Sequence, residues 1–572
     1  MTLMQTLARA EAVAAGRAVP AATVRHPHLG ERPLVFVPLT TAGEAGAPLG
    51  ALIGTDRDAP ELLVVPQPLD RELRFGFFAG LAAALLPRLD AYGDDVEVEP
   101  ATRNLGAPPS RQAGGETEVC AEALQIVVPN SAALEYVRLL GRSTRFLRTV
   151  EDPDAPHPVP VPVPLFGRWL THYAERSRTP GSALLLAMTQ LLTRHWATGQ
   201  SAMEDQHLGA LLAWIDPPPG LDGPTAAARA QTSRAPDGLL LSPPAGPATD
   251  PLFDNRVLAP AMTRYDRARA AEARTAGEHQ ESRTTGRPRD VQARAHAGHR
   301  AAVAEVADAE AEIRRLVGSQ LRPTWDDVWH GLDLLRALPE AGHAQERWKR
   351  DRWSFTGHRD RVRAGEPPQP KRDDAITAAQ KLAGRETAQA RLSAQEALDD
   401  PLAMAARRLS GEAFTGTVLA VEMTYSDGRR PMPRPLVTLA TPDLPQAEPG
   451  TKAYRALPEA RSAQTAEFLA VEPGTPEAAD ASVPGSAPAD GWLVTVKLTG
   501  GMGSGRTPKE GSVPAPGDRV VFTLFEHDPR GGPALPDAEH TPWTHGGPPG
   551  AGTAAVPAQP DTPDPVTAED YL

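Results

Sequence analysis

Short apolar runs alternate with amphipathic stretches along the first 150 residues. Strand-like runs bounded by Gly, Pro or Asp occupy positions 33–38, 51–54, 61–66 and 124–128. Helical patterns cover positions 2–17, 70–86 and 130–140. Because strands and helices interleave, residues 1–150 are predicted to form a small α/β domain.

Proline dominates the start of the next stretch. In residues 152–164 it alternates with small apolar residues, which favours an extended polyproline-II connector. Helices are predicted over 165–176, 179–196 and 202–214, the last opened by Ser201 and Glu204 at capping-box spacing. Residues 151–215 are therefore predicted to be a connector with a helical subdomain, and the Pro-, Gly- and Ala-rich residues 216–253 a linker.

The remaining pattern changes from helix to strand. Residues 254–410 are helical in composition and weakly basic, and apolar residues at three-four spacing over 303–317 form a seam typical of a coiled coil. Residues 411–527 contain about five strand-like runs, which predict a small OB- or SH3-like β-barrel. Residues 528–572 are predicted to be a disordered acidic tail. The predicted class is thus multi-domain α+β.

Composition narrows the possible functions. The single cysteine, Cys120, excludes disulfides within one chain and zinc or iron–sulfur sites that need several cysteines. No signal peptide or membrane-spanning run is recognisable, so a soluble, cytoplasmic protein is expected. Ala, Arg, Pro and Gly are abundant and lysine is rare, which is typical of a high-GC bacterial genome and weakens the meaning of arginine-rich segments.

Charge is unevenly distributed along the chain. The 59 basic and 72 acidic residues give a net charge of −13. Residues 1–253 carry −7, residues 254–410 carry +4, and residues 411–572 carry −10. The helical middle is the only basic part, so attraction to phosphate would depend on local clusters.

Several motif-like segments do not satisfy their templates. Residues 500–507 resemble a phosphate-binding loop, but Pro508 and the prolines after it prevent the helix that such a loop requires, so a flexible barrel loop is predicted. The kinase-like triplet at 358–360 lacks its asparagine and partner motifs. His296 and His299 lie one helical turn apart, but two ligands do not make a metal site. No catalytic residue, metal or cofactor is predicted.

Basic and aromatic residues are interleaved at 347–363. This segment has seven basic and two acidic residues, a mixture suited to phosphates and stacked bases of single-stranded nucleic acid. The alternative is a solvated basic face over an aromatic core, with arginine stems packed against tryptophan. The predicted nucleic-acid-binding residues are Arg347, Trp348, Lys349, Arg350, Arg352, Trp353, Phe355, Arg359, Arg361 and Arg363.

Three functions remain open from the sequence. The first is a non-enzymatic accessory or adaptor protein that acts on or beside nucleic acid, with a partner such as a nucleic-acid motor or nuclease. The second is a protein–protein scaffold with no nucleic-acid role, which would use the seam at 303–317 as a coiled-coil contact. The third is an enzyme with an unrecognised site in the N-terminal domain.

Overall fold

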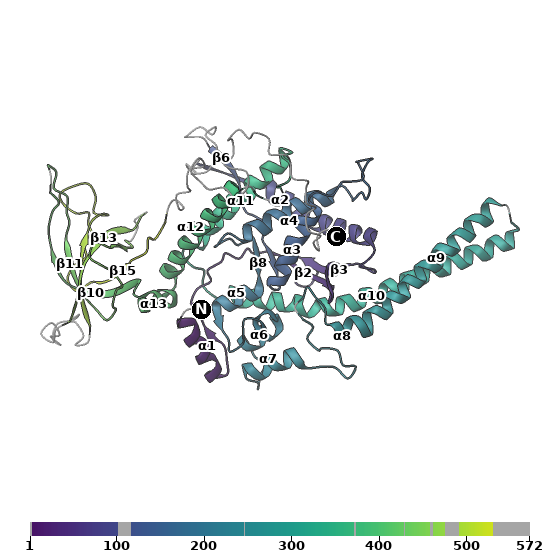
Figure 1. The fold of residues 1–572 in the computed structure, drawn as a ribbon, viewed down its shortest axis with the longest axis horizontal. Coiled ribbons are helices and arrows are strands. Elements are labelled where there is room, and N and C mark those ends of the chain that lie inside the picture. The colour runs from purple at the N-terminus through teal and green to yellow at the C-terminus, as the bar shows by residue number, and fades with distance from the viewer. Residues whose placement is uncertain are drawn as a thin grey trace, which may run out of the picture.

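The computed structural model describes most of the chain. The described residues are 3–100, 116–244, 246–285, 287–370, 373, 375–427, 429–457, 462–474 and 491–529. They form a mixed helical and sheet structure with a closed barrel at its C-terminal side (Figure 1). The predicted disordered tail, 528–572, lies outside the described residues except for Asp528 and Pro529.

A five-stranded mixed sheet forms the centre of the larger part of the molecule, called the body below. In spatial order its strands are β4 (Glu61–Val64), β3 (Glu44–Gly54), β2 (Leu34–Thr41), β7 (Ile126–Val128) and β8 (Leu185–Ala187). The last three strands are parallel, and β3 and β4 are antiparallel to their neighbours. Parallel strands are typically buried on both faces, and β7 and β8 are entirely apolar and buried.

Helices cover both faces of this sheet. On one face pack α2 (Arg71–Asp94), α3 (Ser131–Thr144) and α4 (Pro162–Ser177). On the other face lies the C-terminal half of α10 (Arg289–Arg336). Glycines in β3 permit its close approach, because a Cβ on Gly50 would lie 3.0 Å from Val317 Cγ1.

The predicted helix over 179–196 is wrong in its first half. Residues Leu185–Ala187 form β8, and the helix α5 begins only at Met188 and ends at His195. A short, fully buried apolar run has the same pattern in a parallel strand and in a buried helix. Here the neighbouring β7 supplies the hydrogen-bonding partner that favours the strand.

The N-terminal half of α10 pairs with α9 (Ala259–Thr284) as an antiparallel helical hairpin that projects from the body (Figure 1). Arg264 of α9 forms ion pairs with Glu305 and Glu312 of α10. Val306, Ile313 and Val317 of the predicted seam are buried within this chain, and only Val303 is 43% exposed. The seam is therefore used mainly in intramolecular packing, which corrects its prediction as a contact with another protein.

Three further helices follow α10 along the chain; the first packs into the body, and the other two lead to the barrel (Figure 1). They are α11 (Ala344–Arg363), α12 (Ala375–Asp399) and α13 (Pro401–Leu409). Among the described residues, none of the helices has a sufficiently long apolar stretch to cross a membrane.

The barrel is closed by six antiparallel strands, one more than predicted. Around the circuit they are β10 (Ala413–Glu422), β11 (Leu436–Thr441), β14 (Trp492–Leu498), β13 (Gln464–Pro473), β12 (Lys452–Arg455) and β15 (Arg519–Thr523). The missed strand is β12, whose four residues include two charged ones and therefore lack an apolar run. Phe414, Phe468 and Phe522 fill the interior.

Smaller elements complete the body. The N-terminal α1 (Leu3–Ala15) precedes β1 (Val19–Pro20), which pairs with β9 (Trp196–Ala197). The hairpin of β5 (Val96–Pro100) and β6 (Glu116–Cys120) contacts α11. The remaining helices are α6 (Leu208–Ile215), α7 (Gly223–Thr232) and α8 (Pro251–Phe253), with single turns at Glu204–Gln206 and Asp254–Leu258. Ser201 and Glu204 exchange the two hydrogen bonds of the predicted capping box, but they precede only the turn Glu204–Gln206, and α6 begins at Leu208, so the predicted helix over 202–214 is wrong in its first half.

The body has one continuous hydrophobic core, from Leu29 to Phe355, and the barrel has a separate one. Segments 1–150, 151–215 and 254–410 all contribute side chains to the body core. The proline-rich segment predicted as an extended connector ends inside α4, because Pro162 is tolerated in the first helical turn.

Candidate functional site

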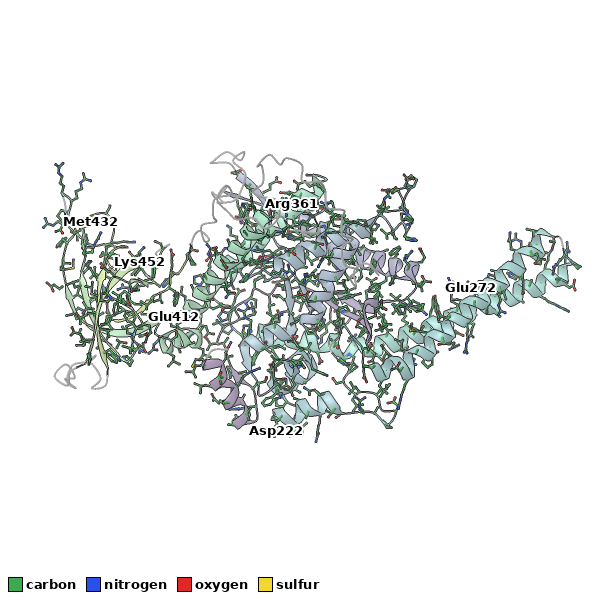
Figure 2. The ribbon with its side chains drawn as sticks, viewed as in Figure 1. Asp222, Glu272, Arg361, Glu412, Met432 and Lys452 are labelled. Carbon is green, nitrogen blue, oxygen red and sulfur yellow. The ribbon has the colours of Figure 1, made fainter. Side chains whose placement is uncertain are left out.

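The helix α11 carries all ten predicted nucleic-acid-binding residues. It lies between the β5–β6 hairpin and α12, and its far end, at Arg361, reaches the surface of the body (Figure 2). Four of the ten residues, Arg347, Trp348, Phe355 and Arg359, are at most 6% exposed. Spacings of seven and four residues place Trp348, Phe355 and Arg359 on one helical face, which packs into the body, and Arg347 lies on the adjoining face.

The two buried arginines bind backbone carbonyls. Arg347 donates from Nη2 to the carbonyl oxygen of His26 at 2.7 Å and from Nη1 to Gln395 Oε1 at 2.9 Å. Arg359 donates from Nη1 to the carbonyl oxygen of Gly93 at 2.7 Å. These guanidinium groups attach α11 to distant parts of the chain, so they are engaged in structural contacts.

The aromatic residues of the cluster also divide by burial. Trp348 stacks on His28 with ring centroids 4.5 Å apart and donates from Nε1 to Glu122 Oε2 at 2.7 Å. Phe355 packs against Trp169 at 5.1 Å. Trp353 alone is half-buried, with part of its indole at the surface.

Acidic residues neutralise much of the outer face of α11. The Lys349 ammonium lies 2.7 Å from a Glu99 carboxylate oxygen, and Arg352 lies 2.9 Å from Glu97. Arg363 pairs with Asp94, and Arg350 pairs with Glu346. Among the described residues, Arg361 is the only cation of the seven with no ion pair or hydrogen bond from its side chain to protein.

One pocket of about 470 Å³ brings part of the cluster together with residues from other segments, and we call it the arginine pocket. Loop 179–181, α11 and α12 form its walls. Five cationic side chains and one carboxylate, Glu346, line it, beside the indole of Trp353. The cationic residues are Arg176, Arg347, Lys349, Arg350 and Arg391.

Buried ionic contacts set the geometry of this pocket. Asp351 is fully buried and accepts hydrogen bonds from Arg176 Nε at 2.9 Å, Ser182 Oγ at 2.8 Å and the Ala183 amide at 2.6 Å. It thereby holds Arg176 and the loop after α4 against α11. The Gly181 backbone, at φ +84°, adopts a conformation that favours glycine and approaches the Arg347 side chain.

The cations of the pocket affect each other. Burial lowers the pKa of Arg350 from its usual value, and the charges of Arg391 and Arg176 lower it further. The carboxylates of Glu346 and Asp528 act in the opposite direction. An additional anion among these guanidinium groups would relieve their repulsion, as a phosphate group can.

A carboxylate from the C-terminal side of the chain already contacts this pocket. Arg391 donates from Nε to Asp528 Oδ1 at 2.8 Å and from Nη2 to the Pro529 carbonyl oxygen at 2.9 Å. Asp528 follows the last barrel strand, so this contact also links the barrel to α12. Its carboxylate therefore already neutralises part of the Arg391 charge.

Two arginines of the pocket lie outside the predicted cluster. Arg176 lies in the last turn of α4, and Arg391 lies on α12, more than 200 positions later. Each is flanked by ordinary helical sequence that carries no motif. Only the packing of α4, α11 and α12 brings them beside Arg350, so no local signal could have identified them.

The histidine pair at 296 and 299 and the kinase-like triplet at 358–360 make packing contacts within the chain. His296 and His299 face His279 of α9, with ring centroids 5.2 and 6.0 Å from it. No group of three or more His, Cys, Asp or Glu side chains in the described part of the chain has an arrangement that could hold a metal ion. His358 is buried and stacks on His172 at 4.2 Å, and Asp360 pairs with Arg359.

Comparisons of the chain with known protein families, with curated proteins and with solved structures find no match.

Proposed function

We propose that this protein is a non-enzymatic accessory protein that binds single-stranded nucleic acid at the arginine pocket. The observation that carries the proposal is the lining of this pocket, in which four cations that are not buried, the buried Arg347 and an indole surround a cavity with one carboxylate. Guanidinium groups bind phosphate oxygens through paired hydrogen bonds, and an exposed indole stacks on bases. The volume of about 470 Å³ lies in the usual range for ligand sites.

Burial restricts this proposal to part of the predicted cluster. Lys349, Arg350 and Trp353 contribute directly, together with Arg176 and Arg391 from outside the cluster. The buried Arg347, Trp348, Phe355 and Arg359 support the helix from within. The remaining three, Arg352, Arg361 and Arg363, do not line the pocket.

Removal of two pocket arginines provides the test. We expect Arg350→Ser with Arg391→Ser to weaken binding of a fluorescent oligothymidylate by about 10- to 100-fold, because two charge-assisted contacts are lost. The dependence of log affinity on log salt should fall by about 1.4 for a single strand. Fluorescence anisotropy at about 50 and 200 mM salt measures both quantities.

The matched control is Arg361→Ser with Arg363→Ser. It removes the same charge as the test variant, but from α11 alone and outside the pocket. Binding should then fall by no more than about 3-fold. An equal loss in both variants would place the site elsewhere on α11, and a folded wild-type protein that does not bind would reject nucleic-acid binding.

The Asp528 carboxylate should compete with the bound phosphate. We expect Asp528→Asn to raise affinity by about 2- to 5-fold, because an exposed ion pair of this kind contributes up to about 1 kcal/mol. The same anisotropy titration measures the change. Glu526→Gln is the control, since Glu526 is exposed two positions away and does not line the pocket. Unchanged or weaker binding in Asp528→Asn would contradict competition at Arg391.

The arrangement of the chain supports an adaptor role within this proposal. We propose that the N-terminal α/β region and the barrel dock a protein partner, such as a nucleic-acid motor or nuclease. The closed barrel has one strand more than the five-stranded OB fold, so an OB- or SH3-like role is proposed by analogy alone.

A second candidate is a scaffold with no nucleic-acid role. The α9–α10 hairpin favours it, because it extends from the body and leaves its outer faces uncovered (Figure 1). Partner capture that needs the hairpin, with no nucleic-acid binding by the folded chain, would favour the scaffold.

A further inference from the structure

Two loops at one end of the barrel concentrate positive charge in the most acidic third of the chain. Residues 411–572 contain 11 basic and 21 acidic residues. Loops 423–435 and 499–516 hold five of these basic residues and only two acidic ones, Asp427 and Glu510. The basic residues are Arg429, Arg430, Arg434, Arg506 and Lys509. We call these two loops the basic barrel end.

Strand pairing brings the two loops together. Leu436, the first residue of β11, pairs with Lys497 near the end of β14. The loop before β11 and the loop after β14 therefore leave the barrel at the same end. Figure 2 shows Met432, in the first loop, on the side of the barrel opposite Glu412, where α13 enters.

The first loop has a defined shape. The Ser426 amide donates to the Met432 carbonyl oxygen at 2.8 Å, and the Arg434 amide donates to the Thr424 carbonyl oxygen at 2.7 Å. These bonds make the loop a hairpin extension whose far end carries Arg429 and Arg430. This pairing lies at the base of the loop, and it reduces the cost of ordering the loop when a ligand binds.

An exposed aromatic ring joins the two loops. Tyr425 is 43% exposed, and the guanidinium carbon of Arg506 lies 5.5 Å from its ring centroid. Arg429, Arg430, Arg506 and Lys509 are exposed, and none of them forms an ion pair within the described part of the chain. These four cations differ from the cations of α11, most of which have acidic partners.

The second loop, residues 499–516, contains several glycines that would let a ligand come close to its backbone. Gly501 and Gly503 adopt φ values of +75° and +87°, and Gly500 and Gly505 add no side chains. The Gly500 amide donates to the Thr465 carbonyl oxygen at 3.1 Å, whereas the exposed Gly501, Gly503 and Gly505 carry no side chain that would hinder an approaching phosphate. Unpaired cations, an exposed ring and open backbone together match the chemistry of single-stranded nucleic acid. An acidic protein segment would use the charges but would not need the tyrosine ring.

We propose that the basic barrel end is a second binding surface for single-stranded nucleic acid, with Arg429, Arg430, Arg506 and Lys509 on phosphates and Tyr425 stacked on a base. This surface uses none of the residues of the arginine pocket, so it does not depend on that site. A strand that is long enough to reach both surfaces gains affinity from their linkage.

The test replaces the four cations in the full chain. We expect Arg429→Ser, Arg430→Ser, Arg506→Ser and Lys509→Ser together to weaken binding of oligothymidylate by about 10-fold or more, and to lower the salt slope by up to about 3. The control removes four exposed arginines near the end of the helical hairpin, Arg274, Arg289, Arg294 and Arg300, for the same change in net charge. It should lose no more than about 3-fold. An unchanged affinity, or an equal loss in the control, would overturn the proposal.

Substitutions at Tyr425 distinguish stacking on a nucleic-acid base from general electrostatic attraction to polyanions. Tyr425→Ala should weaken binding by about 5-fold or more, whereas Tyr425→Phe should retain it because the ring can still stack. If Tyr425→Ala binds like the wild type, the surface attracts charge only and the proposal is rejected. Because these positions are exposed, every variant should keep the melting temperature of the wild type, and this is measured before the binding affinities are compared.

The same titrations distinguish this surface from the arginine pocket. A loss in the barrel variant with none in Arg350→Ser/Arg391→Ser would support the barrel surface and reject the pocket. The reverse result would support the pocket and reject the barrel surface. Losses in both, with a larger combined effect on longer oligonucleotides, would support two linked surfaces.

Discussion

Replacement of Asp351 by alanine should lower the free energy of unfolding of the body by about 3–5 kcal/mol, the usual cost of breaking a buried ion pair. Asp351 is fully buried and accepts hydrogen bonds from Arg176, Ser182 and the Ala183 amide. Burial raises the pKa of this carboxyl group, and its hydrogen bonds and the Arg176 charge oppose that rise. The alanine variant would leave three donors without their acceptor.

The chain offers a convenient probe for this measurement. Its single cysteine, Cys120, is completely buried, and its backbone amide donates to Thr356 Oγ1 of α11 at 3.0 Å. The rate of thiol modification in increasing denaturant therefore reports opening of the body beside α11. Tryptophan fluorescence gives the global transition in the same samples.

Two further variants show whether a loss of stability in Asp351→Ala comes from the broken ion pair. Asp308→Ala, at an exposed position of α10, should change stability by no more than about 0.5 kcal/mol. Joint replacement of Arg176 and Asp351 by apolar residues should cost less than Asp351→Ala alone, because no unpaired charge remains. A change below about 1 kcal/mol in Asp351→Ala would show that the pair does not secure this part of the fold.

Mild acid should destabilise the body through its buried histidines. Burial lowers the pKa of His358 to about 3 and that of His195 to about 4. His358 stacks on His172, and neither ring nitrogen of His358 has a hydrogen-bond partner among the described residues. Arg361 and Arg168 further disfavour a positive charge on His358. In the folded protein the imidazole rings of His358 and His195 therefore stay neutral in mild acid.

The direction of the pH effect follows from these lowered pKa values. Above about pH 6.5 both the folded and the unfolded chain have neutral histidines, so the full stability is present. As the pH falls below that value the unfolded chain binds protons and the folded chain does not, so stability is lost down to about pH 3–4. At about pH 5 each of the two histidines should cost roughly 2 kcal/mol.

One carboxyl group acts in the opposite direction. Burial and the charge of Asp326 raise the pKa of Asp327 to about 7, so protonation of this group stabilises the fold as the pH falls. Because Asp327 offsets part of the histidine effect, the free energy of unfolding of a histidine variant is compared with that of the wild type at each pH. His358→Phe should reduce the loss of stability by about 1.4 kcal/mol per pH unit between about pH 6 and 5.

The control for the pH series replaces the exposed His157 by phenylalanine. It should leave the dependence of unfolding free energy on pH as in the wild type. Denaturant titrations at intervals between about pH 7.5 and 5 measure these slopes. Parallel slopes for His358→Phe and the wild type would show that His358 takes up a proton in the folded state.

The sequence by itself determined the elements whose pattern is local. The predicted runs at 33–38, 51–54 and 61–66 overlap β2, β3 and β4, and the helices α2 and α3 begin one residue after the predicted starts at positions 70 and 130. Period-two and period-3.6 patterns, caps and turns depend on residues within a few positions. The helical middle and five of the six barrel strands were predicted for the same reason.

Only the tertiary structure decided what depends on distant partners. Leu185–Ala187 became a strand because β7 lay beside it, and β12 formed although its own residues have little apolar character. The basic segment 347–363 has a single sequence pattern, but its residues have two different environments. Some are buried and donate to backbone carbonyl oxygens, and others line a pocket together with Arg176 and Arg391. Hydrogen bonding and burial between residues far apart in sequence decided these outcomes, and no local pattern encodes them.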